Sequence, residues 1–343
     1  MKKQSMLLSC WPDGYSRYYT IARSLKEIFG SEHINILDVG GNSEWMHKFL
    51  TEQSINYSLD IVDVRKSEVH NQDVRYMQGD FFKLDLKSYD VVTNTDVLEH
   101  IPKEQKIPFI EQCLLLTKKV AIFSAPFEDP SVTIAEKSIN KLYKKISGKE
   151  QPWLKEHFRF GKPKVNDIEK LLNKKRLPFL CLASNGIDNW LISFFSNLVN
   201  QQVVRFDNMD KINRFYNANI HDVGDTNFVS YRRIYVVFKD KTLANNERVL
   251  KEIFKNSDGQ KISYYSRIFE MVTTKILEIN TLTENLEKAN QQLDKRLDEA
   301  NHEIIKRDKV INDLNLKLSR ITSLKIYKAA RKAKKVTKKL SRK

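Results

Sequence analysis

The amino-acid sequence predicts an α/β fold with a mostly parallel sheet, followed by a C-terminal helical coiled coil. Short apolar runs alternate with amphipathic stretches between Ile34 and Thr117, which is typical of parallel strands joined by crossover helices. Acidic residues or glycines follow the ends of several of these runs. After Ile262, apolar residues recur at helical spacing, and neither Gly nor Pro occurs beyond Gly259.

The individual elements follow from the same patterns. The expected strands span residues 34–39, 55–61, 74–78, 89–93, 119–124, 178–184 and 232–238, and the expected helices span residues 44–53, 105–117 and 190–199. Residues 125–176 contain no clear strand pattern, so we expect an insertion that caps the domain. The chain therefore divides into an α/β domain at residues 1–245, a linker at 246–261, a coiled coil at 262–324 and a basic tail at 325–343.

Composition limits the classes of protein to consider. Apolar residues make up 41% of the 343 residues, which is enough for a core in part of the chain. No apolar run reaches the length of a membrane span or of a signal-peptide core. The three cysteines, Cys10, Cys113 and Cys181, show neither a paired framework nor metal-ligand spacing. We therefore expect a cytoplasmic protein with reduced thiols.

The predicted coiled coil rests on a heptad pattern. Ile279, Leu282, Leu286, Ala289 and Leu293 step alternately by three and four, and the pattern resumes from Leu297 to Ile321 after one extra step of four. It predicts a homo-oligomeric coil of roughly 65 Å, locally unwound near Leu293, with Arg307 at a core position. A single long helix folded back on the domain is the alternative. The almost wholly polar opposite face favours self-association.

The net charge of +16 is concentrated in the tail, where residues 325–343 contain ten Lys or Arg and no acid. On a helix, one side of this tail is apolar and mostly alanine, and the other side is basic. This pattern predicts binding to an anionic membrane surface, at the inner face of the cell membrane. A solvated tail and a nucleic-acid partner are the alternatives. The sequence favours a membrane over nucleic acid because no aromatic residue follows Tyr327.

Four motifs follow successive strands. They are Asp38-Val39-Gly40-Gly41-Asn42, Asp60-Ile61, Gly79-Asp80-Phe81 and the run from Asp90 to Pro102, which includes Asn94. Glycines after a strand allow the backbone to approach a cofactor, and an acid about twenty residues later suits ribose hydroxyls. Asp60 meets that spacing, while Asp63 is a competing choice. Phe81 is interpreted either as an adenine contact or as core packing.

In order and spacing, these motifs resemble those of class I S-adenosylmethionine-dependent methyltransferases, over about residues 20–240. The resemblance implies a Rossmann-like sheet and S-adenosylmethionine as cofactor. It assigns Asp38, Gly40, Gly41 and Asn42 to the methionine part, and Asp60 to the ribose. It further assigns Ile61, Asp80 and Phe81 to the adenine, with Asn94 also in the cofactor site. The chain departs from the usual three-glycine loop, since Asn42 and Glu44 occupy two of the glycine positions.

Transfer of a methyl group to a hydroxyl requires a base or a metal to remove the proton. His100 and His157 are the candidate catalytic bases. Asp96, Glu99, His100 and His157 also resemble the metal-binding motif of some methyltransferases that act on RNA ends or quinone rings. Oxygen and imidazole ligands would suit a divalent ion. The sequence favours a site without metal, because the Leu98-Glu99-His100 run also occurs in this fold without one.

The order of domain, coil and basic tail looks like that of bacterial methyltransferases that modify cell-surface polysaccharides. This resemblance implies O-methylation of a sugar or a sugar phosphate on a cell-envelope glycan. A methyltransferase for RNA or another anionic acceptor is the alternative within enzymes. A coiled-coil scaffold with a degenerate enzyme domain is the alternative outside them.

Overall fold

The computed structural model describes residues 6–41, 44–66, 71–202, 205–206, 208–220, 223–224, 229–254 and 261–340. The chain divides into two compact units, Met1–Thr273 and Thr274–Lys343. Each unit is described by itself below.

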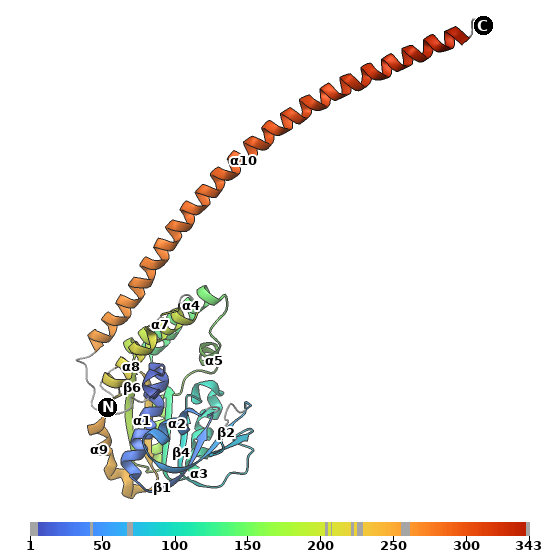
Figure 1. Cartoon of the computed structure of the whole chain (residues 1–343). Coiled ribbons are helices and arrows are strands. Elements are labelled where there is room, and N and C mark those ends of the chain that lie inside the picture. The colour runs from blue at the N-terminus through green and yellow to red at the C-terminus, as the bar shows by residue number, and fades with distance from the viewer. Residues whose placement is uncertain are drawn as a thin grey trace. The chain divides into compact units, whose positions relative to one another are not determined.

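One sheet forms the centre of the first unit (Figure 1), with eight strands among the described residues. They are β1 (His33–Val39), β2 (Asn56–Asp63), β3 (Val74–Gln78), β4 (Tyr89–Thr95), β5 (Thr117–Pro126), β6 (Phe179–Gly186), β7 (Val223–Gly224) and β8 (Ser230–Phe238). Their order is β3-β2-β1-β4-β5-β8-β6-β7. Strands β1 to β5 pair in parallel, and the pairs β5–β8, β6–β8 and β6–β7 are antiparallel. The predicted mostly parallel α/β sheet is confirmed.

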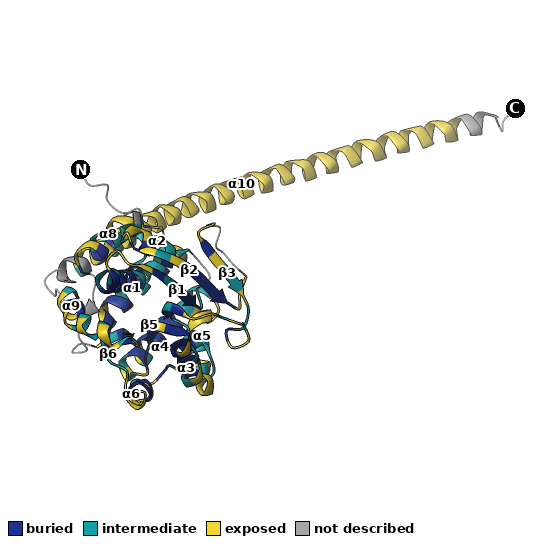
Figure 2. Cartoon of the chain, turned by 90° about the horizontal axis from the view of Figure 1, so that it is seen from below, coloured by how far each residue is buried: buried dark blue, intermediate teal, exposed yellow. Residues whose placement is uncertain are grey.

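Alternating side chains of the strands build a core on each face of the sheet. In β1, Ile34 and Ile36 belong to one core and Leu37 and Val39 to the other, as the two-residue period of a strand requires. Helices α1 (Pro12–Phe29), α2 (Trp45–Glu52) and α9 (Asn246–Ile253) pack on the first face. Helices α3 (Lys106–Leu116) and α6 (Val165–Lys174) pack on the second. Figure 2 shows the strands buried between these layers.

A further group of helices lies beyond the carboxyl ends of the parallel strands (Figure 1). It contains α4 (Pro130–Ser147), α5 (Pro152–Phe160) and α7 (Ile187–Gln202), with α8 (Met209–Asn219) next to α1. Val132, Leu154 and Trp190 form a small core of this cap together with Tyr231 from β8. Short 3-10 helices complete the unit: η1 (Met6–Ser9), η2 (Leu98–His100), η3 (Lys103–Gln105) and η4 (Lys241–Asn245).

Two predicted boundaries are wrong. Residues 125–176 are not a single cap, because α6 buries Ile168 and Leu172 against the sheet as a crossover helix does. Residues 246–254 are not a linker, because they form α9 and the turn after it, and Leu250 is fully buried in the core. Residues 255–260 of the predicted linker lie outside the described residues.

Helix α10 (Lys261–Leu340) begins in the first unit, where Ile268 is buried with Ile212 of α8. In the second unit, which begins at Thr274, the Leu and Ile residues of the heptad pattern are exposed by 42% to 67%. A continuous helix is what a coiled coil requires; self-association stays a prediction. None of the described helices is both long and apolar enough to span a membrane.

Candidate active site

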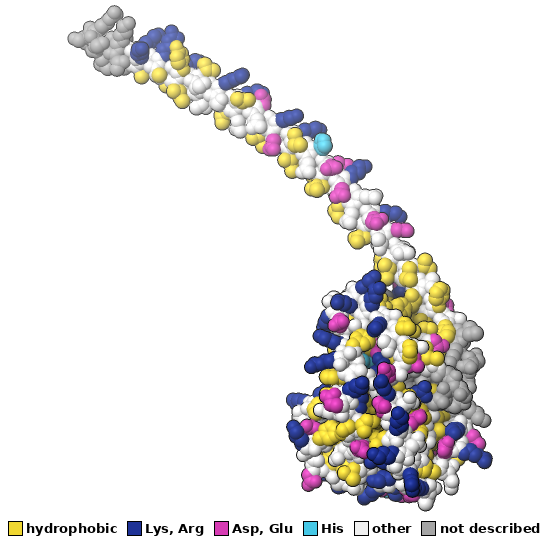
Figure 3. Space-filling model, turned by 180° about the vertical axis from the view of Figure 1, so that it is seen from behind, with side chains coloured by type: hydrophobic (Ala, Val, Ile, Leu, Met, Phe, Trp, Pro, Cys, Tyr) yellow, Lys and Arg dark blue, Asp and Glu magenta, His cyan; other side chains and the backbone are white. Residues whose placement is uncertain are grey.

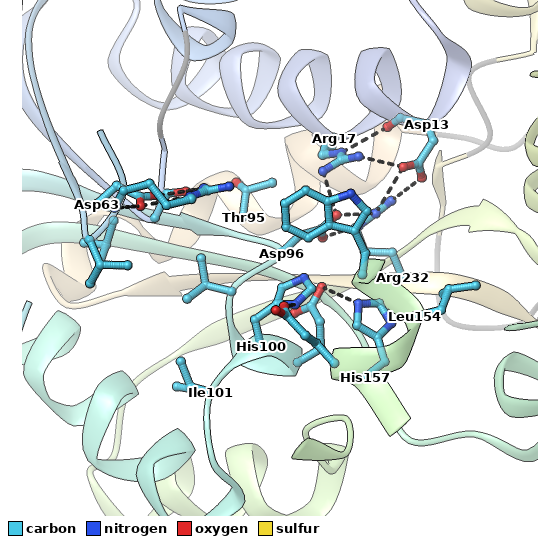
Figure 4. A pocket seen from close by; sticks show the side chains of 18 of the residues that line it. Asp13, Arg17, Asp63, Thr95, Asp96, His100, Ile101, Leu154, His157 and Arg232 are labelled. Atoms are coloured by element: carbon cyan, nitrogen blue, oxygen red, sulfur yellow. Dashed lines mark hydrogen bonds and ion pairs between the residues drawn. The ribbon is translucent and has the colours of Figure 1, made fainter. Parts of the chain in front are cut away.

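A cavity of about 930 Å³ lies between the carboxyl ends of β1, β2 and β4 and the cap helices (Figure 4). This volume is typical of sites for small molecules and cofactors. Loops after the parallel strands line one part of the cavity, and residues of α5, α7 and β8 line another. In Figure 4, Asp63 lies toward one side and His157 toward the other. The site can therefore hold two molecules side by side.

At Gly40 and Gly41, in the loop after β1, a larger side chain would clash with neighbouring atoms. Gly40 has a φ of 88°, and a Cβ there would lie 2.1 Å from Cγ2 of Val97. At Gly41, a Cβ would lie 2.3 Å from Oδ2 of Asp38. The bare backbone of Gly40 therefore lines the cavity. Such a cradle is what a bound cofactor needs for close approach to the chain.

Asp38 lies beneath this loop, buried and next to the cavity wall rather than in it. Its Oδ1 accepts a hydrogen bond of 2.9 Å from the Thr93 hydroxyl. Burial raises the pKa of the Asp38 carboxyl to about 7. Asn42, a further predicted cofactor residue, lies outside the described residues. Glu44 does not line the cavity and pairs instead with Lys48 at 3.7 Å, at the start of α2.

The acid that lines the cavity at the end of β2 is Asp63, not Asp60. Strand β2 extends two residues beyond its predicted end, so that Asp60 lies within the strand. Its Oδ2 accepts a 2.6 Å hydrogen bond from Tyr89 and does not line the cavity. Ile61 is fully buried in the core and likewise does not line it. The predicted residues Asp60 and Ile61 thus do not line the cavity, whereas Asp63 and the exposed Val64 do.

In the free protein, the Asp63 carboxylate is held by Arg65. The backbone N–H of Arg65 donates to Oδ1 at 2.7 Å, Nε donates to Oδ1 at 3.0 Å and Nη2 donates to Oδ2 at 2.7 Å. Asp63 is 5% exposed and Arg65 lies at the surface, where the guanidinium also faces Trp153 at 5.8 Å. These charge-assisted hydrogen bonds fix the orientation of the Asp63 carboxylate, which lines the cavity.

The other predicted cofactor residues divide into two groups. Asp80 and Phe81 line the cavity, where Asp80 is half exposed and Phe81 stacks obliquely on Phe109 at 5.1 Å. Asn94 does not line it. Its side chain is buried and donates to the carbonyl of Val39 at 3.0 Å, which fixes β4 to the end of β1. Asn94 is therefore a support of the loop rather than a contact.

A buried ion network stands at the centre of the cavity (Figure 4). Arg232 donates to both carboxylates, with Nη1 2.7 Å from Oδ1 of Asp13 and Nη2 2.6 Å from Oδ2 of Asp96. Arg17 joins the same two acids, with 2.7 Å contacts to Oδ2 of Asp13 and Oδ2 of Asp96. Two positive and two negative charges balance, which is what burial of ions requires.

The network ties α1 to β8 and to the loop after β4. Burial raises the pKa of Asp13, but Arg232 and Arg17 lower it more, so that the pKa lies well below its usual range. Asp96 has a φ of 52°, a conformation that non-glycine residues rarely adopt. Both of its oxygens are occupied by guanidinium groups. Asp96 therefore does not belong with the histidines in a metal site, as the sequence alternative supposed.

His157 and His100, the predicted bases, come together on the other side of the cavity. Their ring centroids are 4.8 Å apart. Nδ1 of His157 lies 2.8 Å from Oε1 of the fully buried Glu136, and Nδ1 of His100 lies 2.7 Å from Oε2 of Glu156. Nε2 of His157 lies 4.0 Å from Oε1 of Glu99. Each imidazole is thus oriented by a carboxylate and presents its second nitrogen to other partners.

Glu136 is further held by two buried partners that the sequence reasoning missed. Lys162 contacts its Oε2 at 2.6 Å, and the Tyr231 hydroxyl donates to its Oε1 at 3.1 Å. Burial raises the pKa of Glu136, and His157 and Lys162 lower it more, to below its ordinary value. The residue is therefore an anion that stabilises a proton on Nδ1 of His157. Glu136 lies in the amphipathic helix α4, and no pattern in the sequence of this helix marks it as a site residue.

Glu99 differs in character from Glu136. Burial and the nearby Asp96 raise its pKa well above the ordinary value. Its Oε2 has no hydrogen-bond partner within the described part of the chain. Burial and His157 lower the pKa of His100. These surroundings therefore favour the neutral carboxylic acid of Glu99 and the neutral imidazole of His100 more than water does.

One ligand atom each of Glu99, His100 and His157 lie within 4.8 Å of one another. Imidazole and carboxylate donors suit a divalent ion, and histidine ligands commonly donate their other nitrogen to a carboxylate. The same orientation by a carboxylate also suits a general base. The donor set therefore fits a metal without requiring one.

Comparison with known proteins gives structural relatives only. No protein-family model matches the sequence, and no curated protein matches it. Magnesium protoporphyrin IX methyltransferase from Synechocystis with bound SAH is 16% identical with a TM-score of 0.41, covering 66% of this chain and 84% of that chain. The plantazolicin methyltransferase BpumL with a monoazolic desmethylPZN analogue and SAH is 14% identical with a TM-score of 0.43, covering 66% and 84%. A cyclopropane-fatty-acyl-phospholipid synthase-like protein from Lactobacillus casei is 10% identical with a TM-score of 0.37, covering 65% and 91%. Similarity this low does not transfer a function to this chain.

Proposed function

We propose that this chain is an S-adenosylmethionine-dependent methyltransferase that methylates a hydroxyl group. The observation that carries the proposal is the composition of one cavity. Gly40, Asp63 and Asp80-Phe81 line one part of it, and His157 lines the other, with the buried Glu136 carboxylate behind it at 2.8 Å from Nδ1. A cofactor half and a proton-accepting half thus share one space.

The residues at the strand ends fit the parts of the cofactor. Asp63 offers a carboxylate to ribose hydroxyls, Gly40 offers bare backbone to the methionine part, and Asp80 with Phe81 offers a polar edge and a ring to the adenine. Asp38 lies beneath the loop, where a positively charged amino group of the cofactor would lower its raised pKa and favour the carboxylate. When bound, S-adenosylmethionine supplies a methyl group on a sulfonium centre.

The contribution of the chain to the reaction is orientation and removal of a proton. Glu136 holds the proton of His157 on Nδ1, which leaves Nε2 free to accept the proton of an acceptor hydroxyl. The His157 imidazolium formed in this way is stabilised by the Glu136 carboxylate. Because His157 is 5% exposed, this charge interaction operates away from bulk water.

The acceptor in this proposal is a sugar or sugar phosphate of a cell-envelope glycan, and the C-terminal helix brings the enzyme to it. Figure 3 shows hydrophobic side chains recurring along α10, with Lys and Arg gathered toward its C-terminal end. We propose that the seam around Leu286 and Ile311 forms a homo-oligomeric coil. The ten basic residues at 325–343 would then attach the oligomer to an anionic membrane at its inner face.

The experiment has two stages on the full chain. Calorimetry should show S-adenosylmethionine binding, and His157→Ala should lower turnover about a hundredfold or more while leaving that affinity unchanged. Cell-envelope glycans of strains with and without the protein should then differ by a methyl ether. Absence of cofactor binding would leave a scaffold role, and methylated RNA in place of glycan would refute the glycan acceptor. Full activity in a chelator would exclude a catalytic metal, whereas loss of activity restored by a divalent ion would assign Glu99, His100 and His157 to it.

A further inference from the structure

The charges that line the cavity are unequal, although the chain as a whole is strongly basic. Among the described residues, the lining contains six carboxylates and three guanidinium groups, and no lysine. The carboxylates are Asp13, Asp63, Asp80, Asp96, Glu99 and Glu156, and the cations are Arg17, Arg65 and Arg232. Even with Glu99 protonated, the lining carries more negative than positive charge.

None of the three cations is available to an incoming anion. Arg17 and Arg232 are each bound to two carboxylates, and Arg65 is bound to Asp63. A phosphate in the cavity would have to displace one of these carboxylates or remain beside them. Like charges within a few ångströms repel strongly where water is excluded. A cationic sulfonium cofactor suits this lining, whereas an anionic acceptor does not.

Aromatic and amide side chains also line the cavity. Besides the aromatic residues at the strand ends, they include Trp11, Tyr143, Trp153, Trp190, Phe194 and Tyr231, and the amides of Gln105, Gln151, Asn197 and Gln201. Aromatic faces pack against the C–H bonds of a ring, while amides and imidazoles exchange hydrogen bonds with hydroxyls. This combination serves a molecule that has both an apolar ring face and several hydroxyl groups.

Trp153 of α5 is the aromatic side chain best placed to contact such a ring. Its indole is 51% exposed, whereas Trp190 is 1% exposed and stacked on Tyr231 at 4.0 Å. The Trp153 ring meets the His100 ring edge-on at 5.6 Å, and the Arg65 guanidinium lies 5.8 Å from its centroid. Trp153 therefore lies where the proposed cofactor half meets the half around the histidines.

We infer that the acceptor is bound here as a neutral sugar ring, with Trp153 against its face and a hydroxyl directed at Nε2 of His157. This inference rests on the proposed function and narrows its acceptor, because it excludes phosphorylated sugars and nucleic acid. The basic tail does not contradict it, since those charges belong to a different part of the chain.

The test uses the full-length protein saturated with S-adenosylhomocysteine and a panel of probes. The probes are neutral methyl hexopyranosides, the corresponding sugar 6-phosphates, uronic acids, catechol and a short single-stranded RNA. Saturation-transfer NMR of this complex measures binding of each probe. Labelled S-adenosylmethionine, added to the protein without S-adenosylhomocysteine, measures methyl transfer. A neutral glycoside should bind at least about tenfold more tightly than its phosphate. Glu156→Gln should narrow this difference severalfold, because it removes one negative charge.

A pair of tryptophan variants locates the binding site. Trp153→Ala should weaken neutral glycoside binding about tenfold and leave S-adenosylhomocysteine affinity unchanged. Trp45→Ala is the matched control, since the Trp45 indole is 39% exposed and does not line the cavity. Tighter binding of phosphates, catechol or RNA, or no glycoside binding at all, would overturn the inference. Lack of S-adenosylhomocysteine binding by calorimetry would instead refute the proposed function.

Discussion

Exchange of single carboxylates at the end of β2 tests which acid holds the cofactor. Asp63→Asn should weaken binding of S-adenosylmethionine, and Asp60→Asn should not. The two residues lie three positions apart on one strand, so each variant is the matched control of the other. Both substitutions preserve side-chain shape and remove one negative charge. A difference between them therefore reports position and not net charge.

The size of the effect follows from the contacts of Asp63. A hydrogen bond to a charged group contributes about 1.5–3 kcal/mol, and a ribose offers two hydroxyls. These bonds compete with Nε and Nη2 of Arg65, at 3.0 and 2.7 Å, so only part of this free energy is gained on binding. We expect a net loss of about 1.5–3 kcal/mol in Asp63→Asn, or a roughly 10- to 100-fold weaker affinity. In Asp60→Asn, the amide oxygen still accepts from Tyr89, so the cost is about 1 kcal/mol of folding stability.

Isothermal titration calorimetry of the full chain measures these affinities, and urea unfolding measures the stability of each variant. Affinity of Asp63→Asn within twofold of the unsubstituted protein would refute the assignment. Loss of binding in a folded Asp60→Asn variant would restore the acid that the sequence spacing predicts. Equal losses in both would show that net charge near the loop matters more than a direct contact.

Four further predictions follow. Glu136→Gln should lower turnover by about 10²- to 10⁴-fold in steady-state assays without changing cofactor affinity, and should destabilise the fold by about 3–5 kcal/mol because Lys162 loses its buried partner. Burial raises the pKa of Asp38 from 3.8 to about 7, so the folded chain holds a proton that the unfolded chain releases. The free energy of unfolding of the unsubstituted protein should therefore fall by roughly 4 kcal/mol between about pH 4 and pH 7, relative to that of Asp38→Asn. Urea unfolding that gives the same pH dependence for both proteins would contradict this. Light scattering should show an oligomer for the full chain and a smaller species for a protein ending at Thr273; equal association would refute the coil. Truncation after Tyr327 should abolish salt-sensitive binding to anionic vesicles, and retained binding would refute the membrane role of the tail.

The two-residue error in β2 shows where sequence reasoning stops. The spacing from Asp38 selected Asp60 because the apolar run around Ile61 gave no sign of where the strand ends. Its end is fixed by neighbours, since Asp63 pairs with Gln78 of β3 and Val62 pairs with Val39 of β1. Register across a sheet is a long-range property. The motif was thus placed on the correct strand, while the acid that lines the cavity there is Asp63, three residues beyond the predicted one.

The ion network could not be predicted for a related reason. Asp13 and Arg232 are 219 positions apart, and no periodicity connects them. Helix α1, which contributes Asp13 and Arg17, was itself not among the predicted elements. One local signal was available: Arg232 lies just before the mostly apolar run Ile234–Phe238 of β8, and a charged side chain buried with such a strand requires a partner. His100 and His157 were found because histidine is rare and its chemistry is specific.

The tail is positively charged and the cavity lining is negatively charged, so the two are suited to different partners. If the tail at 325–343 served to concentrate an anionic acceptor such as RNA, the residues around the transfer point would also have to accept phosphate groups. Instead, every arginine in the described lining of the cavity is paired with a carboxylate, and the lining contains two further carboxylates, those of Asp80 and Glu156. An anion attracted by the tail would therefore be repelled at the site of reaction. The two features are compatible when the anion is the surface on which the enzyme rests and the acceptor is a neutral group carried on that surface.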